Sequence, residues 1–118
     1  MLNDYISTGQ IYLAMGHTDL RRGIDGLAVI VQDHYGKEIK ENDIFIFCGR
    51  RNDRIKALLW EGDGFLLLYK RLEKGTFKWP RRRSDLAEIN SEQYRKLMRG
   101  LEIELNKIPR QKLAPRII

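Results

Sequence analysis

The strongest constraint on the fold of this chain is a block of three apolar segments joined by short turns. The first is a continuous hydrophobic run, typical of a central strand with both faces covered, and the next two have the apolar patterns of strands. The three segments are residues 44–47, 54–60 and 65–72. Turn residues from Gly49 to Asp53 separate the first two, and the hairpin sequence Asp63-Gly64 separates the last two. The block therefore predicts an antiparallel meander.

A further reversal after this block predicts a fourth strand in the meander. Gly75 marks the turn, and in residues 76–79 the two aromatic side chains, Phe77 and Trp79, share one face of the chain. Pro80 is expected to end this strand because it has no backbone N–H to donate to a ladder.

A strand and a helix are expected before the meander. Residues 10–15 alternate as a strand does, and the apolar spacing between Asp19 and Tyr35 is that of one helical face. The expected buried stripe of this helix is Ile24, Leu27, Ala28, Val31 and Tyr35. We expect Thr18 or Asp19 to cap its start and Gly36 to cap its end.

A second helix is predicted to begin after Asn90, where several features agree. Asn90 is a good N-cap with Gln93 three residues later, and Ile89 and Tyr94 stand at the positions of a hydrophobic staple. The expected buried stripe is Tyr94, Leu97, Met98, Leu101 and Leu105. Pro109 is expected to end this helix.

Together these segments predict an α+β fold: a small antiparallel sheet, in the order β-α-β-β-β-β-α, with two helices packed on it. With 118 residues, of which 42% are hydrophobic, the chain fits a single domain, 1–118. Residues 106–118 carry four cations, two prolines and no acid, so we expect a flexible basic tail there. The sequence has neither a bilayer-spanning apolar run nor a signal peptide, so we expect a cytoplasmic protein that contacts no membrane.

Positive charge is concentrated in residues 49–83. This stretch holds eleven of the 22 Lys and Arg residues but four of the 16 Asp and Glu residues, so it carries +7 while the other 83 residues carry −1. In an antiparallel meander its basic turns converge at one end of the sheet. Arg is suited to phosphate because its planar fork pairs two oxygens at once. The clustering therefore favours an acidic partner, and first of all DNA.

The candidate binding residues follow from this interpretation. The cations expected to contact nucleic acid are Arg50, Arg51, Arg54, Lys56, Lys70, Arg71, Lys74, Lys78, Arg81, Arg82 and Arg83. Trp60, Phe77 and Trp79 are a candidate apolar face for a protein partner. Against that second interpretation, tryptophans in a small sheet are more often core or interface residues.

The residue types that support catalysis or metal binding form no recognisable pattern. His17 and His34 are the only histidines, and a turn and a helix end explain their positions without catalysis. Residues 38–40 match half of a nuclease motif, which identifies a nuclease only together with an upstream acid on a neighbouring strand. Cys48 stands alone within a strand, so we expect plain burial. We therefore expect no enzymatic activity, no metal and no cofactor.

Three segments of the sequence resemble one known family. They are GHTDLRRGIDGL at 16–27, the block at 44–80, and a Q-x-x-x-L-x-x-G-L pattern at 93–101. They are similar to the TnpB accessory protein of the insertion-sequence sixty-six group of transposable elements. The resemblance implies a small protein that is encoded beside a DDE-type transposase and takes part in transposition. This chain departs from the usual pattern at Cys48, Asn52 and Leu59, where arginine, glycine and tryptophan are common.

Three functions from different classes remain open. The leading hypothesis is a non-catalytic accessory protein of transposition that binds DNA at the element ends and acts with the transposase. The second is an adaptor that grips the transposase through the apolar face and makes no nucleic-acid contact. The third is an RNA-binding module, because strands with basic turns and exposed aromatics also suit single strands.

Overall fold

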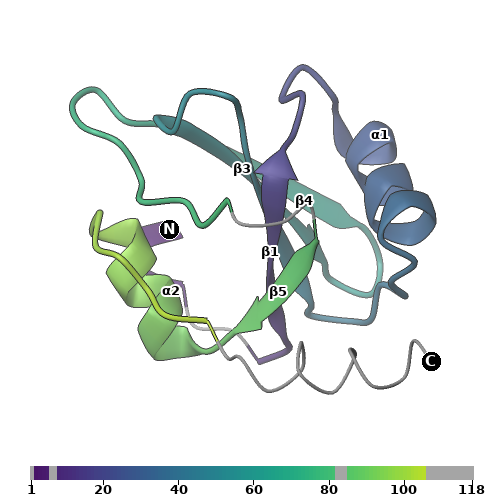
Figure 1. The fold of residues 1–118 in the computed structure, drawn as a ribbon. Helices are drawn as coiled ribbons and strands as arrows, with labels where there is room; N and C mark the ends of the chain where they lie inside the picture. The colour runs from purple at the N-terminus through teal and green to yellow at the C-terminus, as the bar shows by residue number, and fades with distance from the viewer. Residues whose placement is uncertain (1, 6–7, 82–84, 106–118) are drawn as a thin grey trace, which may run out of the picture.

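The computed structural model describes residues 2–5, 8–81 and 85–105, which form one sheet with a helix on each face (Figure 1). The strands are β1 (Ile11–His17), β2 (Ile44–Cys48), β3 (Arg54–Trp60), β4 (Phe65–Arg71) and β5 (Leu86–Ile89). The helices are a short 3-10 turn (Leu2–Asp4), α1 (Ile24–Val29) with a π-helical continuation (Ile30–His34), and α2 (Ser91–Met98). The α+β class and the order β-α-β-β-β-β-α are confirmed. The predicted basic tail at 106–118 lies outside the described residues.

The predicted meander is confirmed as β2, β3 and β4, which pair antiparallel in sequence order. The strand order across the sheet is β4-β3-β2-β1-β5, so β2 is central, and all five of its residues are buried. Burial on both faces explains why Ile44 to Phe47 are uniformly apolar instead of alternating. The turn at Asp63-Gly64 is closed by the Glu61 N–H, which donates to the Gly64 carbonyl at 2.9 Å.

One strand pair departs from the antiparallel prediction. β1 runs parallel to β2, from Ile11 opposite Ile44 to His17 opposite Cys48, with an irregularity before the last pair. A parallel pair needs a long crossover connection, and α1 provides it. The sheet is therefore mostly antiparallel, and the ends of β1 and β2 lie side by side.

The predicted strand at 76–79 is wrong. This segment has no strand pairing; its residues Phe77 and Trp79 are only 1% and 5% exposed, because they pack against one face of the sheet. The two aromatic side chains do share one face of the segment, as predicted. An extended segment that lies on a sheet buries every second side chain, so its sequence has the same alternation as a strand. The fifth strand is instead β5, which pairs antiparallel with β1 at the opposite edge from β4.

The helix ends follow the sequence in part. Asn90 and Gln93 form the predicted capping box at the start of α2. The helix ends at Met98 and not at Pro109, because Gly100 takes φ +83° and reverses the chain. Leu101 is consequently 48% exposed and is not part of a buried stripe.

The first helix is shorter at its start than the spacing predicts. Its N-cap is Gly23 with no side-chain cap, so the predicted capping by Thr18 or Asp19 is wrong. Gly36 has φ +63°, as the predicted C-terminal cap requires. No helix in the described part of the chain is long and apolar enough to cross a membrane.

Two apolar clusters lie on opposite faces of the sheet because successive strand residues point to opposite sides. On the face covered by α2, here called the α2 face, strand residues pack with Phe77, Trp79 and the α2 residues Tyr94 and Leu97. On the face covered by α1, here called the α1 face, strand residues including Phe45 pack with helix residues. The Trp79 indole N–H donates to the Ala14 carbonyl at 2.9 Å, which ties the segment after β4 to β1.

Candidate nucleic-acid interface

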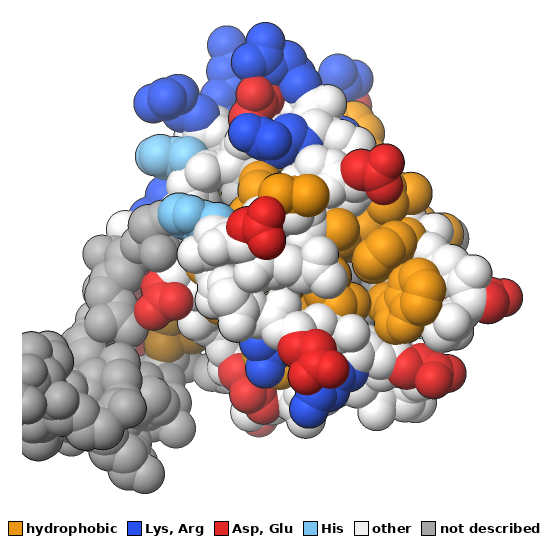
Figure 2. Space-filling model, turned by 90° about the vertical axis from the view of Figure 1, so that its right-hand side faces the viewer, with side chains coloured by type: hydrophobic (Ala, Val, Ile, Leu, Met, Phe, Trp, Pro, Cys, Tyr) orange, Lys and Arg blue, Asp and Glu red, His pale blue; other side chains and the backbone are white. Residues whose placement is uncertain are grey.

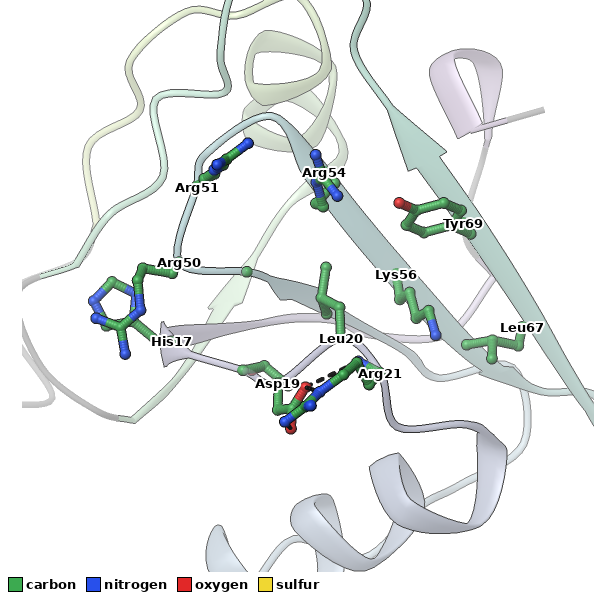
Figure 3. A pocket seen from close by; sticks show the side chains of 12 residues that line it. His17, Asp19, Leu20, Arg21, Arg50, Arg51, Arg54, Lys56, Leu67 and Tyr69 are labelled. Atoms are coloured by element: carbon green, nitrogen blue, oxygen red, sulfur yellow. Dashed lines mark hydrogen bonds and ion pairs between the residues drawn. The ribbon is translucent and has the colours of Figure 1, made fainter.

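A groove opens on the α1 face where the ends of β1 and β2 meet the start of β3 (Figure 3). Its volume is about 920 Å³, within the range of ligand-binding clefts. The lining residues, which define the basic groove, are His17, Thr18, Asp19, Leu20, Arg21, Gly49, Arg50, Arg51, Arg54, Lys56, Leu67 and Tyr69. Five of these are Lys or Arg and one is acidic, so the groove is positively charged.

The floor of the groove is formed by β3 and β4. Strand alternation places Arg54 and Lys56 of β3 on the same face as Tyr69 of β4, and Lys56 lies directly opposite Tyr69 in the register. The Lys56 Nζ donates to the Arg22 carbonyl at 2.9 Å and lies 5.7 Å from the centre of the Tyr69 ring. Arg54 is paired with Asp53, with 3.0 Å between Nε and Oδ1. Both cations are thus held in place by their neighbours.

The turn between β2 and β3 supplies the least restrained charges. Arg50 and Arg51 are exposed, and neither forms an ion pair with a carboxylate within the described part of the chain. Cys48 lies beneath this turn; it is fully buried, as predicted, and burial raises the pKa of its thiol to about 11. A buried neutral thiol leaves the two arginines as the chemically available groups of the turn.

The opposite wall is the loop between β1 and α1, which the charge count of residues 49–83 does not reveal. Arg21 reaches into solvent with its side chain 91% exposed, although its guanidinium contacts Asp19 at 2.9 Å. The hydrogen bonds from Arg21 hold the pKa of Asp19 down to about 2, so this carboxylate stays ionised. The pair therefore adds little net charge to the groove.

His17 stands at the end of the groove beside Arg50, as Figure 3 shows. The pKa of His17 lies below its usual 6.5. The positive charge of Arg81 is the largest cause, and partial desolvation and the charge of Arg50 add to it. His17 was not predicted as a binding residue. Only the pairing of β1 with β2, in which His17 lies opposite Cys48, brings it to the basic turn.

Arg81 has a structural position that its sequence context does not suggest. Its guanidinium donates to the Gly16 carbonyl at 3.1 Å, to the Asn52 side-chain oxygen at 2.7 Å, and to the Gly49 carbonyl. Gly16 lies near the end of β1, and Gly49 and Asn52 both belong to the turn between β2 and β3. Arg81 therefore clamps the end of β1 to the turn between β2 and β3 at one end of the basic groove, and its guanidinium is engaged by the protein itself.

The other predicted cations do not join the basic groove. Lys70 points to the α2 face, where its ammonium contacts the side-chain oxygen of Asn3. Arg71 lies opposite Arg54 in the register but pairs with Glu73 at 3.5 Å. Lys74 and Lys78 are exposed in the segment that follows β4. Arg82 and Arg83 lie outside the described residues.

The three aromatic residues predicted as an apolar face are not brought together. Phe77 and Trp79 are buried on the α2 face, as the core interpretation of Trp79 predicts. Trp60 is half-buried on the α1 face and packs on Phe65, with ring centres 4.8 Å apart. They offer no common exposed surface to a partner.

The molecular surface also shows the positive charge gathered at one end of the molecule. Figure 2 shows Lys and Arg side chains gathered at the upper end of the molecule, the end at which the loop leaving β1 lies in Figure 1. Asp and Glu side chains are mostly spread over the middle and lower parts of this view. Among the described residues, no group of three or more His, Cys, Asp or Glu side chains could hold a metal ion. What the groove offers is fixed positive charge beside one exposed aromatic ring.

Comparison with known proteins identifies the family of the chain. Two proteins of Sinorhizobium fredii (strain NBRC 101917 / NGR234), named uncharacterized proteins y4hO and y4jC, are each 32% identical to it over 93 residues. The matched regions cover 79% of this chain and 81% and 80% of the two relatives. No solved structure matches the chain. Residues 9–108 match the family described as IS66 Orf2 like protein, so the chain belongs to this family of transposition accessory proteins.

Proposed function

We propose that this protein is a non-catalytic accessory of transposition that binds DNA through the basic groove. The observation that carries the proposal is the convergence of cations from two chain segments on one groove: Arg50 and Arg51 from the turn after β2, and Arg54 and Lys56 from β3. A positively charged groove concentrates phosphate groups and needs no particular base sequence. Positioning the element ends for the transposase is the step in which such contacts serve transposition.

The chemistry of the groove suits phosphate. Arg50 and Arg51 present exposed guanidinium forks, and Lys56 is held over the floor by the Arg22 carbonyl. With about five phosphate contacts, the affinity for DNA should fall several hundred-fold between roughly 50 and 200 mM salt, because each contact releases counterions. A strong salt dependence is therefore the first expected property of binding.

A charge-neutralising pair tests the groove directly. Arg50→Gln with Arg51→Gln removes two exposed cations that form no ion pair in the described chain. We expect a loss of about tenfold or more in affinity for terminal-repeat DNA at about 100 mM salt, and a salt slope smaller by about two. Fluorescence anisotropy over a salt series measures both quantities.

The matched control changes charge equally on the other side of the molecule. Arg95→Gln with Lys96→Gln removes two exposed cations from α2, which packs on the α2 face. This variant should keep the wild-type affinity and slope to within about twofold. Equal losses in the two variants would show a diffuse charge effect and remove the groove from the proposal. Capture of the transposase that survives nuclease and high salt, with no DNA binding, would instead favour the adaptor.

A further inference from the structure

Tyr69 is an exposed aromatic side chain inside the basic groove. It is 54% exposed, and among the described residues the other large exposed hydrophobics are Val29 and Leu101, neither of which lines the groove. Figure 3 shows its ring near Arg54 and Lys56, on the side of the groove away from His17. An aromatic ring left open among phosphate-binding cations calls for a functional explanation.

The neighbours of Tyr69 place positive charge on two sides of the ring. Lys56, its cross-strand partner, lies 5.7 Å from the ring centre. The Tyr69 hydroxyl interacts with Arg54, and this contact adds to the larger effect of Asp53 in raising the pKa of Arg54. The ring is therefore held at a fixed position in a β-strand, with an ammonium group and a guanidinium group beside it. Cations that hold a backbone, together with a ring on which a base can lie, form a platform for single-stranded nucleic acid.

A duplex offers no free base face on which such a ring can stack. Its bases are stacked inside the helix, so a groove that binds a duplex backbone contacts phosphates through cations and hydrogen-bond donors and not through an aromatic face. Bases in a single strand are free to stack on an aromatic side chain, and every base has a face that can do so. The basic groove of about 920 Å³ is large enough to hold a nucleotide between its walls.

We propose that the basic groove binds single-stranded DNA, with one base stacked on Tyr69 and the adjoining phosphates held by Arg54, Lys56 and the arginines of the turn after β2. This inference rests on the proposed function and makes its substrate more specific. In transposition, the matching substrate is DNA that is unpaired or frayed at an element end. Tyr69 supplies affinity that does not depend on salt, whereas the cations supply affinity that does.

The test compares one ring substitution on two forms of DNA. The full chain is titrated by anisotropy against a labelled single-stranded 20-mer and against a hairpin duplex of similar length, both at about 50 mM salt. Tyr69→Ala should lose roughly tenfold in affinity for the single strand, with an unchanged salt slope, and should keep its affinity for the duplex. Tyr69→Phe keeps the ring and should bind the single strand as the wild type does. Val29→Ala removes an exposed apolar group outside the groove and should change neither affinity.

A second measurement reports stacking itself. A single 2-aminopurine in the oligonucleotide should lose fluorescence when it binds the wild type and Tyr69→Phe, and should lose much less with Tyr69→Ala. An unchanged affinity and an unchanged fluorescence response in Tyr69→Ala would overturn the inference. Binding of the same single strand as RNA more than tenfold tighter than as DNA would overturn the assignment to DNA.

The two proposals fail in different ways. If neither DNA form binds at about 50 mM salt, the proposed function itself fails. If the duplex binds with a steep salt dependence while Tyr69→Ala matches the wild type on both forms, only the single-strand inference fails. Thermal unfolding of each variant confirms that a loss of binding is not a loss of fold.

Discussion

The two faces of the central sheet differ in how completely they are covered. The α2 face is closed by α2, the 3-10 turn and the segment containing Phe77 and Trp79, and the residues of β1, β2 and β3 that point to it are almost fully buried. On the α1 face, α1 and its continuation pack on one apolar cluster of strand residues, while Tyr69 and the charged end of β3 remain open to the basic groove.

This difference divides the basic stretch of the sequence. The turn after β2 presents its arginines at the open face, whereas residues 77–81 are used by the structure: two side chains fill the closed face and Arg81 clamps the end of β1 to the turn after β2. Charge that is continuous in the sequence is therefore not continuous in space. The comparison predicts that substitutions on the closed face change stability and those on the open face change binding.

The largest expected effect is on the closed face. Trp79→Ala removes a side chain that is 5% exposed and leaves a cavity, so the free energy of unfolding should fall by about 3–5 kcal/mol. Tyr69→Ala, an aromatic truncation on the open face, should change it by about 0.5 kcal/mol or less. Urea unfolding measures both. Similar losses in the two variants would break the distinction between the faces.

If Trp79→Ala does not fold, Trp79→Phe gives a graded version of the same test. It keeps a ring in the core but removes the indole N–H that donates to the Ala14 carbonyl. The unpaired buried carbonyl should cost about 1–3 kcal/mol. A cost near zero would show that packing alone holds this segment on the sheet.

Substitution of Arg81 should have the next largest effect on the free energy of unfolding. It tests whether this cation stabilises the fold or binds DNA. Arg81→Gln loses charge-assisted hydrogen bonds to Gly16 and Gly49 and should lower the free energy of unfolding by about 1.5–3 kcal/mol. Arg50→Gln should leave the unfolding free energy within about 0.5 kcal/mol of the wild type. An unchanged unfolding free energy in Arg81→Gln, combined with weaker DNA binding, would return Arg81 to the phosphate-binding residues.

Local sequence patterns determine much of this fold. The meander follows from strand patterns and the turn at Asp63-Gly64, and the start of α2 follows from the capping box of Asn90 and Gln93. The sequence does not reveal β5, because four residues are too few to show a period and its pairing with β1 joins segments far apart in the sequence. Residues 76–79 were assigned to a strand because extended chain lying on a face has the same alternation.

The site was predictable to a smaller extent. Arg50, Arg51, Arg54 and Lys56 were identified from charge clustering, and strand alternation correctly separates Lys70 from them once β4 is located. Arg21 and His17 reach the groove only through the parallel pairing of β1 with β2, which local pattern does not encode. The hydrogen bonds of Arg81 join it to two segments distant in the sequence, the end of β1 and the turn after β2, so charge clustering alone does not reveal this structural position.

His17 provides the smallest and most specific effect at the open face. The pKa of His17 is lower in the folded protein than in the unfolded chain, mainly because of Arg81 and to a lesser extent because of desolvation and Arg50. The unfolded chain therefore binds the proton more readily. The contribution of His17 to stability is therefore present above pH 6.5 and is lost as the pH falls below that value. A phosphate in the groove has the opposite effect: it favours the charged imidazolium, so DNA binding should strengthen as the pH falls from about 7.5 to 5.5.

The gain should be a few-fold and absent in His17→Gln. His34 is present in both proteins, so its titration cancels in the comparison, and Asp19, with its pKa near 2, stays ionised throughout the range. Anisotropy titrations at constant ionic strength measure the pH dependence of both proteins. Parallel pH profiles would show that His17 faces no phosphate and would restrict the DNA path to the arginine turn and the floor of the groove.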